Sequence, residues 1–207
     1  IANQFGRELV RGEATVRMLE PRADGPEGGM SDSGSRVVVV TGGSRGIGAA
    51  TVRKLVATNH AVVVNYLSAE AEAQRLVAEV RGAGGQAIAV RGDVSDEAEV
   101  EATFLAAEAA FGPVGAVVHC AAPPPVPQPF DDLPIDTLIR QFDIQVRGAF
   151  LCAKRALPAM VKAQAGSIVF VGSIFAEGTP PPQQAAYVVA KAGLAALARS
   201  LAVEYGP

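Results

Sequence analysis

Short runs of β-branched apolar residues alternate with longer segments of helical spacing from residue 36 onward. The apolar runs are VVVVT (37–41), AVVVNY (61–66), QAIAVRGD (86–93), GAVVHCA (115–121) and GSIVFVGS (166–173). Runs without a polar face are typical of parallel strands that are covered on both sides of a sheet. The helical segments cover 47–58, 69–84, 96–111, about 134–163 and 185–206, with Ser95 as the expected N-cap of the third. The alternation predicts an α/β fold with a doubly wound parallel sheet in three layers.

The composition supports a large folded core and argues against nucleic acid or a membrane as the binding partner. Apolar residues make up 49% of the 207 residues and charged residues 19%, which excludes an intrinsically disordered chain. The net charge of −3 offers no positive surface for nucleic acid or for an anionic membrane. No stretch approaches the ~18 uninterrupted apolar residues of a membrane span. We therefore expect a soluble, cytoplasmic protein that binds neither nucleic acid nor membrane.

The two cysteines, Cys120 and Cys152, have no CxxC spacing and no cluster of histidines beside them. A disulfide framework or a zinc site needs such a set of residues, so no metal is expected. Both cysteines are predicted to be small core residues in a reducing compartment.

Residues 1–29 differ from the rest of the chain in composition. They mix charged residues with glycine and proline and end in EPRADGPEGG, whereas Met30 resembles a natural start shortly before the first strand. We predict a disordered extension over 1–29, followed by one domain over 30–207. A short docking helix within 1–29 remains the alternative.

A glycine-rich turn, TGGSRGIG at 41–48, links the first predicted strand to the first helix. Glycine permits the unusual backbone angles of such a turn and the close approach of a pyrophosphate. The free N–H groups and the positive dipole at the helix N-terminus attract phosphate. Because the turn opens the first βαβ unit, it predicts a dinucleotide site that is contacted by Gly42, Ser44, Arg45, Gly46, Ile47 and Gly48.

The end of the second predicted strand bears on which dinucleotide is bound. A site that prefers NAD places an acid there to accept a hydrogen bond from the ribose 2′-hydroxyl. In this chain the position holds Tyr66, with Asn65 before it, and Arg45 in the glycine turn offers a cation to a 2′-phosphate. We therefore expect Asn65 and Tyr66 beside the cofactor, and NADP(H) in preference to NAD(H). If Arg45 is merely solvated, NAD(H) remains an alternative.

Three residues near the end of the chain suit acid–base chemistry. Tyr187 and Lys191 lie at i and i+4 and so share one face of the last predicted helix. Ser173 falls at the end of the fifth predicted strand, where ligands bind in such sheets. A lysine ammonium beside a tyrosine favours the phenolate, and a serine hydroxyl can hold a substrate carbonyl. The set predicts proton transfer at a carbonyl or an alcohol.

The order and spacing of these motifs resemble the short-chain dehydrogenase/reductase superfamily, and most closely its 3-oxoacyl-(acyl-carrier-protein) reductases. TGGSRGIG at 41–48 is similar to the family's TGxxxGxG, GDVSD at 92–96 to the segment after its third strand, and YVVAK at 187–191 to its YxxxK. The resemblance spans residues 36–207. It implies the Rossmann fold and reversible hydride transfer between a nicotinamide and a ketone or secondary alcohol.

The resemblance also implies a role for each matched residue. Tyr187 is expected to act as the general acid, and Ser173 to polarise the carbonyl. Lys191 would hold the nicotinamide ribose and assist Tyr187. The cofactor contacts after the third and fourth strands would come from Asp93, which would face the adenine, and from Val94 and Ala121.

The chain departs from the family pattern at three places before its end. The family's NNAG is HCAA here, so His119 is expected to replace one structural hydrogen bond of a lost asparagine. The family's fourth catalytic residue is an asparagine that organises water for a proton relay, and its place holds Gln145, with one more methylene. The run PPPVPQP at 123–129 either stiffens one wall of the substrate mouth or forms a solvated polyproline II stretch.

By resemblance, the family fold continues past this chain's last residues with a sixth strand, a Pro-Gly turn, a substrate lid and a seventh strand. We therefore expect a C-terminally truncated domain that lacks the last strands of the fold. The helix at 185–205 and the helix before it would form the interface of a homodimer or homotetramer. Their small residues suit close helix packing either between subunits or within one.

Two classes of function follow. The leading interpretation is an NADPH-dependent reductase of a 3-oxoacyl thioester, with the acyl group carried on acyl carrier protein; reductases of sugars, steroids or quinones are alternatives within the same class. The other class is a nucleotide-binding module with weak or no turnover. The residues at positions 119 and 145 favour the module, whereas the intact Ser173, Tyr187 and Lys191 oppose it.

Overall fold

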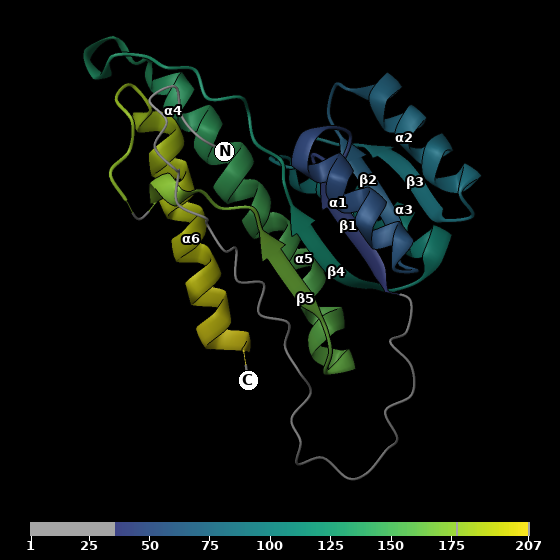
Figure 1. Ribbon diagram of the computed structural model, residues 1–207. Helices are drawn as coiled ribbons and strands as arrows, with labels where there is room; N and C mark the ends of the chain where they lie inside the picture. Colours follow the sequence, from purple (N-terminus) through teal and green to yellow (C-terminus); the bar gives the residue numbers. More distant parts are fainter. Residues whose placement is uncertain (1–35, 177, 207) are drawn as a thin grey trace.

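The computed structural model describes residues 36–176 and 178–206. The extension predicted over 1–29 lies outside these residues. Within them, five parallel strands form one sheet in the order β3-β2-β1-β4-β5, with helices on both faces (Figure 1). The strands are β1 (Val37–Thr41), β2 (Ala61–Tyr66), β3 (Gln86–Arg91), β4 (Val114–His119) and β5 (Ser167–Phe170). The predicted doubly wound α/β fold is confirmed.

The helices alternate with the strands as the periodicity predicts. They are α1 (Gly46–Ala57), α2 (Glu70–Gly82), α3 (Glu97–Phe111), α4 (Ile135–Phe142), α5 (Gly148–Ala163) and α6 (Ala185–Tyr205). Short 3₁₀ turns occur at η1 (Phe130–Asp132) and η3 (Ile174–Ala176), and a π-helical turn, η2 (Asp143–Arg147), joins α4 to α5. The long helical region predicted over 134–163 is therefore one helix path that contains a π turn.

The apolar run of β1 is continuous because successive side chains face opposite sides of the sheet. Val37 and Val39 belong to a core cluster with residues of α3 and α5. Val38 and Val40 belong to a second cluster, with residues of α1 and α2. Both faces of the central strand β1 are therefore covered by apolar side chains. The two cysteines also belong to the apolar interior: Cys152 is a member of the first cluster, and Cys120 packs against the second.

Three predicted strand ends are wrong by two or three residues. β3, β4 and β5 end at Arg91, His119 and Phe170, whereas the apolar pattern runs on to 93, 121 and 173. The residues after these three strand ends do not pair with a neighbouring strand and instead form the loops at the carboxyl edge of the sheet. Ser173 consequently lies in the loop after β5, not on the strand.

The predicted N-cap of α3 is also wrong. The cap is Asp96, whose carboxylate accepts hydrogen bonds from the N–H groups of Ala98 and Glu99. Ser95 instead donates its N–H and its hydroxyl to the carboxylate of Asp93. A carboxylate at the first turn also benefits from the helix dipole, which explains the preference for Asp96.

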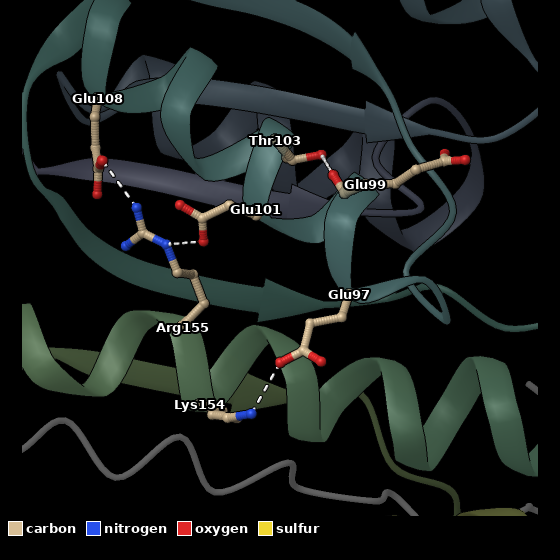
Figure 2. Close-up of polar contacts among 7 residues, drawn as sticks. All are labelled: Glu97, Glu99, Glu101, Thr103, Glu108, Lys154 and Arg155. Atoms are coloured by element: carbon tan, nitrogen blue, oxygen red, sulfur yellow. Dashed lines mark hydrogen bonds and ion pairs between the residues drawn. The ribbon is translucent and has the colours of Figure 1, made fainter.

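Ion pairs join α5 to α3 on one face of the sheet (Figure 2). Arg155 of α5 donates to Glu101 at 2.6 Å and to Glu108 at 2.9 Å, and Lys154 donates to Glu97 at 2.8 Å. Pairs at the surface contribute roughly 0–1 kcal/mol each. The pairs connect α3 to the first half of α5, the helix that follows the π turn.

One helix among the described residues, α6, is long and apolar enough to cross a membrane by length and composition, with a mean hydropathy of 1.4. Core helices of globular domains have the same length and composition. In this fold α6 packs against α4, η2 and β5 (Figure 1), and its Lys191 is buried. We therefore treat α6 as an element of the domain.

Candidate active site

The glycine turn between β1 and α1 has the backbone that its sequence predicts. Gly42 and Gly46 have φ values of +59° and +55°, a region that other residues rarely adopt. A Cβ atom on Gly42 would lie 2.9 Å from the backbone of Ala121, and one on Gly48 would overlap the carbonyl of Gly42. The turn is therefore a close cradle of backbone that ends at the N-terminus of α1. It fits the pyrophosphate of a dinucleotide.

The side chains of this turn divide into two groups. Ser44 is buried, whereas Arg45 and Ile47 are exposed. Arg45 is the N-cap of α1, has extended backbone angles and is exposed. Ile47 is 64% exposed, which leaves an apolar side chain available to a ligand.

Asn65 and Tyr66, at the end of β2, are both buried. The backbone carbonyl of Asn65 accepts from Gly43 N–H at 3.0 Å, and its side-chain amide donates to the carbonyl of Gly92 at 3.0 Å. Asn65 thus ties the glycine turn to the segment after β3. In that segment Val94 is buried and Asp93 is half-buried, so the structure brings these predicted cofactor residues to the same carboxyl edge.

His119 ends β4 and joins three separate segments. Its Nε2 lies 3.1 Å from the carbonyl of Ile144, which can only accept, so Nε2 carries the proton. Its Nδ1 therefore accepts from the hydroxyl of Thr41 at 2.9 Å. That hydroxyl accepts in turn from Ala121 N–H at 3.3 Å. His119 makes two hydrogen bonds where the sequence predicts one.

This network keeps His119 neutral. Burial lowers the pKa of His119 to about 4, and the positive charge of Lys191 adds to the effect. Full burial without a carboxylate partner makes the imidazolium costly. The role of His119 is therefore to fasten the end of β1, the loop after β4 and the turn η2 to one another.

Tyr187 and Lys191 lie one turn apart at the start of α6, as their spacing predicts. The Nζ of Lys191 is 5.8 Å from the centre of the Tyr187 ring and donates to the carbonyl of Val171 at 2.6 Å. Ser173 is two residues beyond Val171, and its Oγ accepts from Phe175 N–H at 3.2 Å. The turn η3, which begins directly after Ser173, packs against α6. The loop after β5 and the start of α6 therefore bring the three predicted residues into one region.

Burial sets the electrostatics of this region. It lowers the pKa of Lys191 to about 8, while the neighbouring Cys120 thiol opposes the shift. Burial also raises the pKa of Cys120 to about 11 and that of Cys152 to about 12. At neutral pH both thiols are therefore protonated, and Lys191 is a cation that releases its proton more readily than a solvated lysine.

Gln145 lies within the π turn η2 and is fully buried. Its Nε2 donates to Oε1 of Gln141 at 2.5 Å. The turn η2 packs against α6, which carries Tyr187 and Lys191. Gln145 is thus a buried amide on an element adjacent to α6.

The proline-rich segment over 123–129 is joined to the loop just before α6. Gln128 N–H donates to the carbonyl of Gln183 at 2.9 Å, and Gln183 lies just before α6. Val126 on this segment and Ile174 after β5 are exposed apolar side chains. The segment is thus tied to the loop before α6 by a backbone hydrogen bond.

Sequence patterns did not single out Thr41, Gln141 or Val171. Thr41 ends β1, and its pairing with His119 across the sheet only becomes visible once β1 and β4 are neighbours. Val171 contributes a backbone carbonyl, for which no residue type is diagnostic. Gln141 stands four residues before Gln145, and that i, i+4 spacing of two glutamines is the one signal that could have identified it.

Comparison with known proteins places the chain in a family. The family model described as short chain dehydrogenase matches residues 36–207. The chain is 37% identical to 3beta-hydroxysteroid dehydrogenase 1 of Eggerthella lenta, over 84% of the chain and 66% of that protein. It is 39% identical to cis-4-hydroxycyclohexanecarboxylate dehydrogenase of Sinomonas cyclohexanicum, over 82% and 67%. It is 34% identical to a 3-oxoacyl-(acyl-carrier-protein) reductase of Synechocystis sp., over 82% and 68%.

The solved structures agree with these relatives. A dehydrogenase/reductase from Sinorhizobium meliloti has a TM-score of 0.76 and 31% identity, over 83% of this chain and 67% of that one. The chain spans about two thirds of the length of the curated relatives that it matches. The matched region includes the glycine turn, the π turn and the residues Ser173, Tyr187 and Lys191. The chain belongs to the short-chain dehydrogenase family.

Proposed function

We propose that this chain is the cofactor-binding and catalytic part of an NADPH-dependent reductase that converts a ketone to a secondary alcohol, reversibly. One observation carries the proposal. Tyr187 and Lys191 lie at the start of α6, and Lys191 bonds the carbonyl of Val171, two residues before Ser173, at the carboxyl edge of the sheet that also bears the glycine turn. A nucleotide-binding module without turnover would not require these three side chains.

The residues divide the chemistry among themselves. The bound nicotinamide supplies hydride transfer to the carbonyl carbon. The Ser173 hydroxyl donates a hydrogen bond to the carbonyl oxygen, which orients it and polarises it. The Tyr187 hydroxyl donates its proton to that oxygen as negative charge develops. The ammonium of Lys191, close to the Tyr187 ring, stabilises the phenolate left behind.

In the proposed complex, the dinucleotide phosphates are held by backbone groups of the glycine turn. Gly42 and Gly48 leave the space that a Cβ would fill, and the N–H groups at the start of α1 are the donors for its phosphates. The preference for NADPH is supported by the exposed Arg45 at this helix end and by the absence of an acid at Tyr66 and Leu67. NADH would lose the interaction with Arg45 but keep the phosphate cradle.

A 3-oxoacyl thioester, carried on acyl carrier protein, is the first substrate class. It is supported by the similarity to the Synechocystis reductase. A ring ketone is the second, because relatives of comparable identity act on a hydroxysteroid and on a hydroxycyclohexane, and because Val126 and Ile174 offer exposed apolar surface near the site. The two classes differ in shape, so a direct comparison of rates separates them.

We also propose that the chain's partner is a second copy of itself, in the cytoplasm. The helix path from α4 to α5 carries exposed apolar side chains at spacings of three, four and eight residues, which form one stripe: Ile135, Ile139, Phe142 and Phe150. A homodimer would bury this stripe. Analytical ultracentrifugation tests the proposal, and a monomer at micromolar concentration would overturn it.

The decisive assay follows the absorbance of NADPH with acetoacetyl thioesters and with substituted cyclohexanones, for the wild-type chain and for Tyr187→Phe. Turnover that depends on Tyr187 supports the reductase, and the faster substrate identifies the class. NADPH binding without turnover of any carbonyl would favour the module instead. Turnover that survives in Tyr187→Phe would remove the proposed mechanism.

A further inference from the structure

Two buried glutamines and one backbone carbonyl form a chain of hydrogen bonds beside the site. Gln141 lies near the end of α4, one turn before Gln145, and only 4% of it is exposed. Its Nε2 donates to the carbonyl of Pro124 at 3.3 Å. Its Oε1 accepts from Nε2 of Gln145 at 2.5 Å. The chain therefore runs from the proline-rich segment through α4 to the π turn η2.

The carbonyl of Pro124 determines how both amides are oriented. A carbonyl oxygen can only accept, so Gln141 must turn its nitrogen toward Pro124 and its oxygen toward Gln145. That oxygen can also only accept, so Gln145 must present its nitrogen to Gln141. The Oε1 of Gln145 is the atom that remains. Among the described residues it is the one buried side-chain nitrogen or oxygen without a hydrogen-bond partner.

A buried acceptor without a donor is costly, so its retention calls for a function. The backbone around Gln145 is also unusual. Gly148 N–H bonds the carbonyl of Asp143, five residues earlier, and His119 holds the neighbouring carbonyl of Ile144. Single π turns inside helices are frequent at functional sites. The surroundings of Gln145 are thus arranged to present this one oxygen.

We propose that Gln141 is a positioning residue: held by Pro124, it keeps Oε1 of Gln145 free to accept a hydrogen bond in the proton path of the reaction. The inference rests on the proposed function, because a module without turnover needs no such path. It also gives the proline-rich segment a role. Proline at 123 and at 125 restricts the backbone on both sides of the Pro124 carbonyl, which keeps that acceptor in place.

The first test is Gln141→Met, with Gln74→Met as the matched control. Methionine keeps the length of the side chain and removes both hydrogen bonds, whereas Gln74 is exposed on α2. We expect kcat of Gln141→Met to fall about tenfold, with KM for NADPH within about twofold of wild type, because Gln145 is then free to turn its oxygen away. A kcat equal to that of Gln74→Met would overturn the proposal.

The second test, Gln141→Glu, separates orientation from packing. A neutral carboxyl can donate to Pro124 and accept from Gln145, whereas a carboxylate cannot donate. The kcat of this variant should approach that of wild type at low pH and fall, relative to wild type, as the carboxyl ionises. His119 and Lys191, whose segments contact η2, are present in both proteins, so the wild type measured over the same pH range is the reference for their titration. A ratio that does not change with pH would contradict the orienting role.

A third measurement does not depend on turnover. The side-chain amide of Gln145, assigned in NMR spectra by its loss in Gln145→Glu, should exchange slowly with water in the wild type and faster in Gln141→Met. Unchanged exchange would refute the orientation by Gln141. If the exchange changes as expected but the wild-type chain reduces no carbonyl, the orientation stands and the proposed function fails.

Discussion

The two halves of the sheet are packed differently. In the half that bears the glycine turn, every residue of β1 and β2 is buried. In the half that bears Ser173, all residues of β5 are only half-buried, and among the described residues this strand pairs with β4 alone. The phosphate cradle therefore stands at the end of two fully buried strands, whereas the proposed acid–base residues stand beside a strand that has no buried residue.

The difference indicates how the two tasks are divided. The nucleotide half is built from backbone: glycines of unusual φ, a helix N-terminus and a tie through Asn65. The proposed catalytic half is built from side chains on α6 and on the loop after β5. Substitutions in the first half should change folding and cofactor binding, whereas those in the second should change turnover and leave binding intact.

The largest effect is expected for Tyr187→Phe in the catalytic half. Loss of the proton donor should lower kcat about 10³-fold, since general acid catalysis contributes about 10²–10⁴-fold. NADPH affinity, measured by fluorescence titration, should stay within about twofold of wild type. Tyr205→Phe, at the exposed end of α6, is the matched control and should retain full activity. A Tyr187→Phe variant that loses NADPH affinity as well would contradict the proposed separation between a half that binds the cofactor and a half that catalyses the reaction.

Gly42→Val should damage the nucleotide half. The new side chain would require φ near +59° and would meet the backbone of Ala121, so the free energy of unfolding should fall by about 2–4 kcal/mol and NADPH binding should be lost. Gly82→Ala is the control, because a Cβ there meets nothing within 4 Å. Urea unfolding and NADPH titration provide the measurements. Normal NADPH affinity in Gly42→Val would argue against the backbone cradle.

His119 lies between the two halves, and its effect should depend on pH. Unfolded histidine binds a proton near pH ~6.5, whereas folded His119 does so only near its pKa of about 4. The unfolded state therefore takes up more protons between these values, and stability should fall by up to about 3 kcal/mol as pH drops from ~6.5 to 4.

The variant His119→Asn should lack this component of the acid-induced loss. His60→Asn, which changes the chain's other histidine, is the control for it. Denaturant midpoints measured at several pH values for the two variants and the wild type provide the comparison. Identical pH dependence in wild type and His119→Asn would mean that the pKa of His119 does not change on folding.

The smallest effect is expected at the edge of the nucleotide site. Arg45→Ser should weaken NADPH binding about tenfold, because it removes a charge-assisted hydrogen bond to the 2′-phosphate, and should leave NADH binding unchanged. Lys54→Ser, at the other end of α1, removes the same charge and is the control. Equal losses for NADPH and NADH would indicate that Arg45 acts on the pyrophosphate and not on the 2′-phosphate.

The sequence predicted the architecture well where the signal was local. The bounds of β1 and β2 agree with the prediction because their apolar runs begin directly after Arg36 and His60, and β1 ends at the glycine turn. The end of β5 was misplaced because VGS continues the apolar pattern after the ladder has ended at Phe170. Val171 has the same β-branched apolar character as the strand residues before it, so the pattern does not mark where the pairing with β4 ends.

The candidate site was predictable in its motifs and not in its connections. Tyr187 and Lys191 share one helix, so their spacing alone places them on one face. The hydrogen bonds of His119 reach Thr41 and Ile144, which are 78 and 25 residues away in the chain. The spacing of residues along the sequence does not indicate which distant hydrogen-bonding group lies beside a buried imidazole in the folded protein.

By itself, the sequence determined the alternation of strands and helices, the glycine turn that opens the first helix, and the placing of Tyr187 and Lys191 on one helix face, because each depends on residues close together in the chain. Only the tertiary structure decided that His119 is neutral and that the amide oxygen of Gln145 is left free. Both outcomes depend on carbonyls that can only accept, those of Ile144 and Pro124, and packing alone brings such groups to their donors.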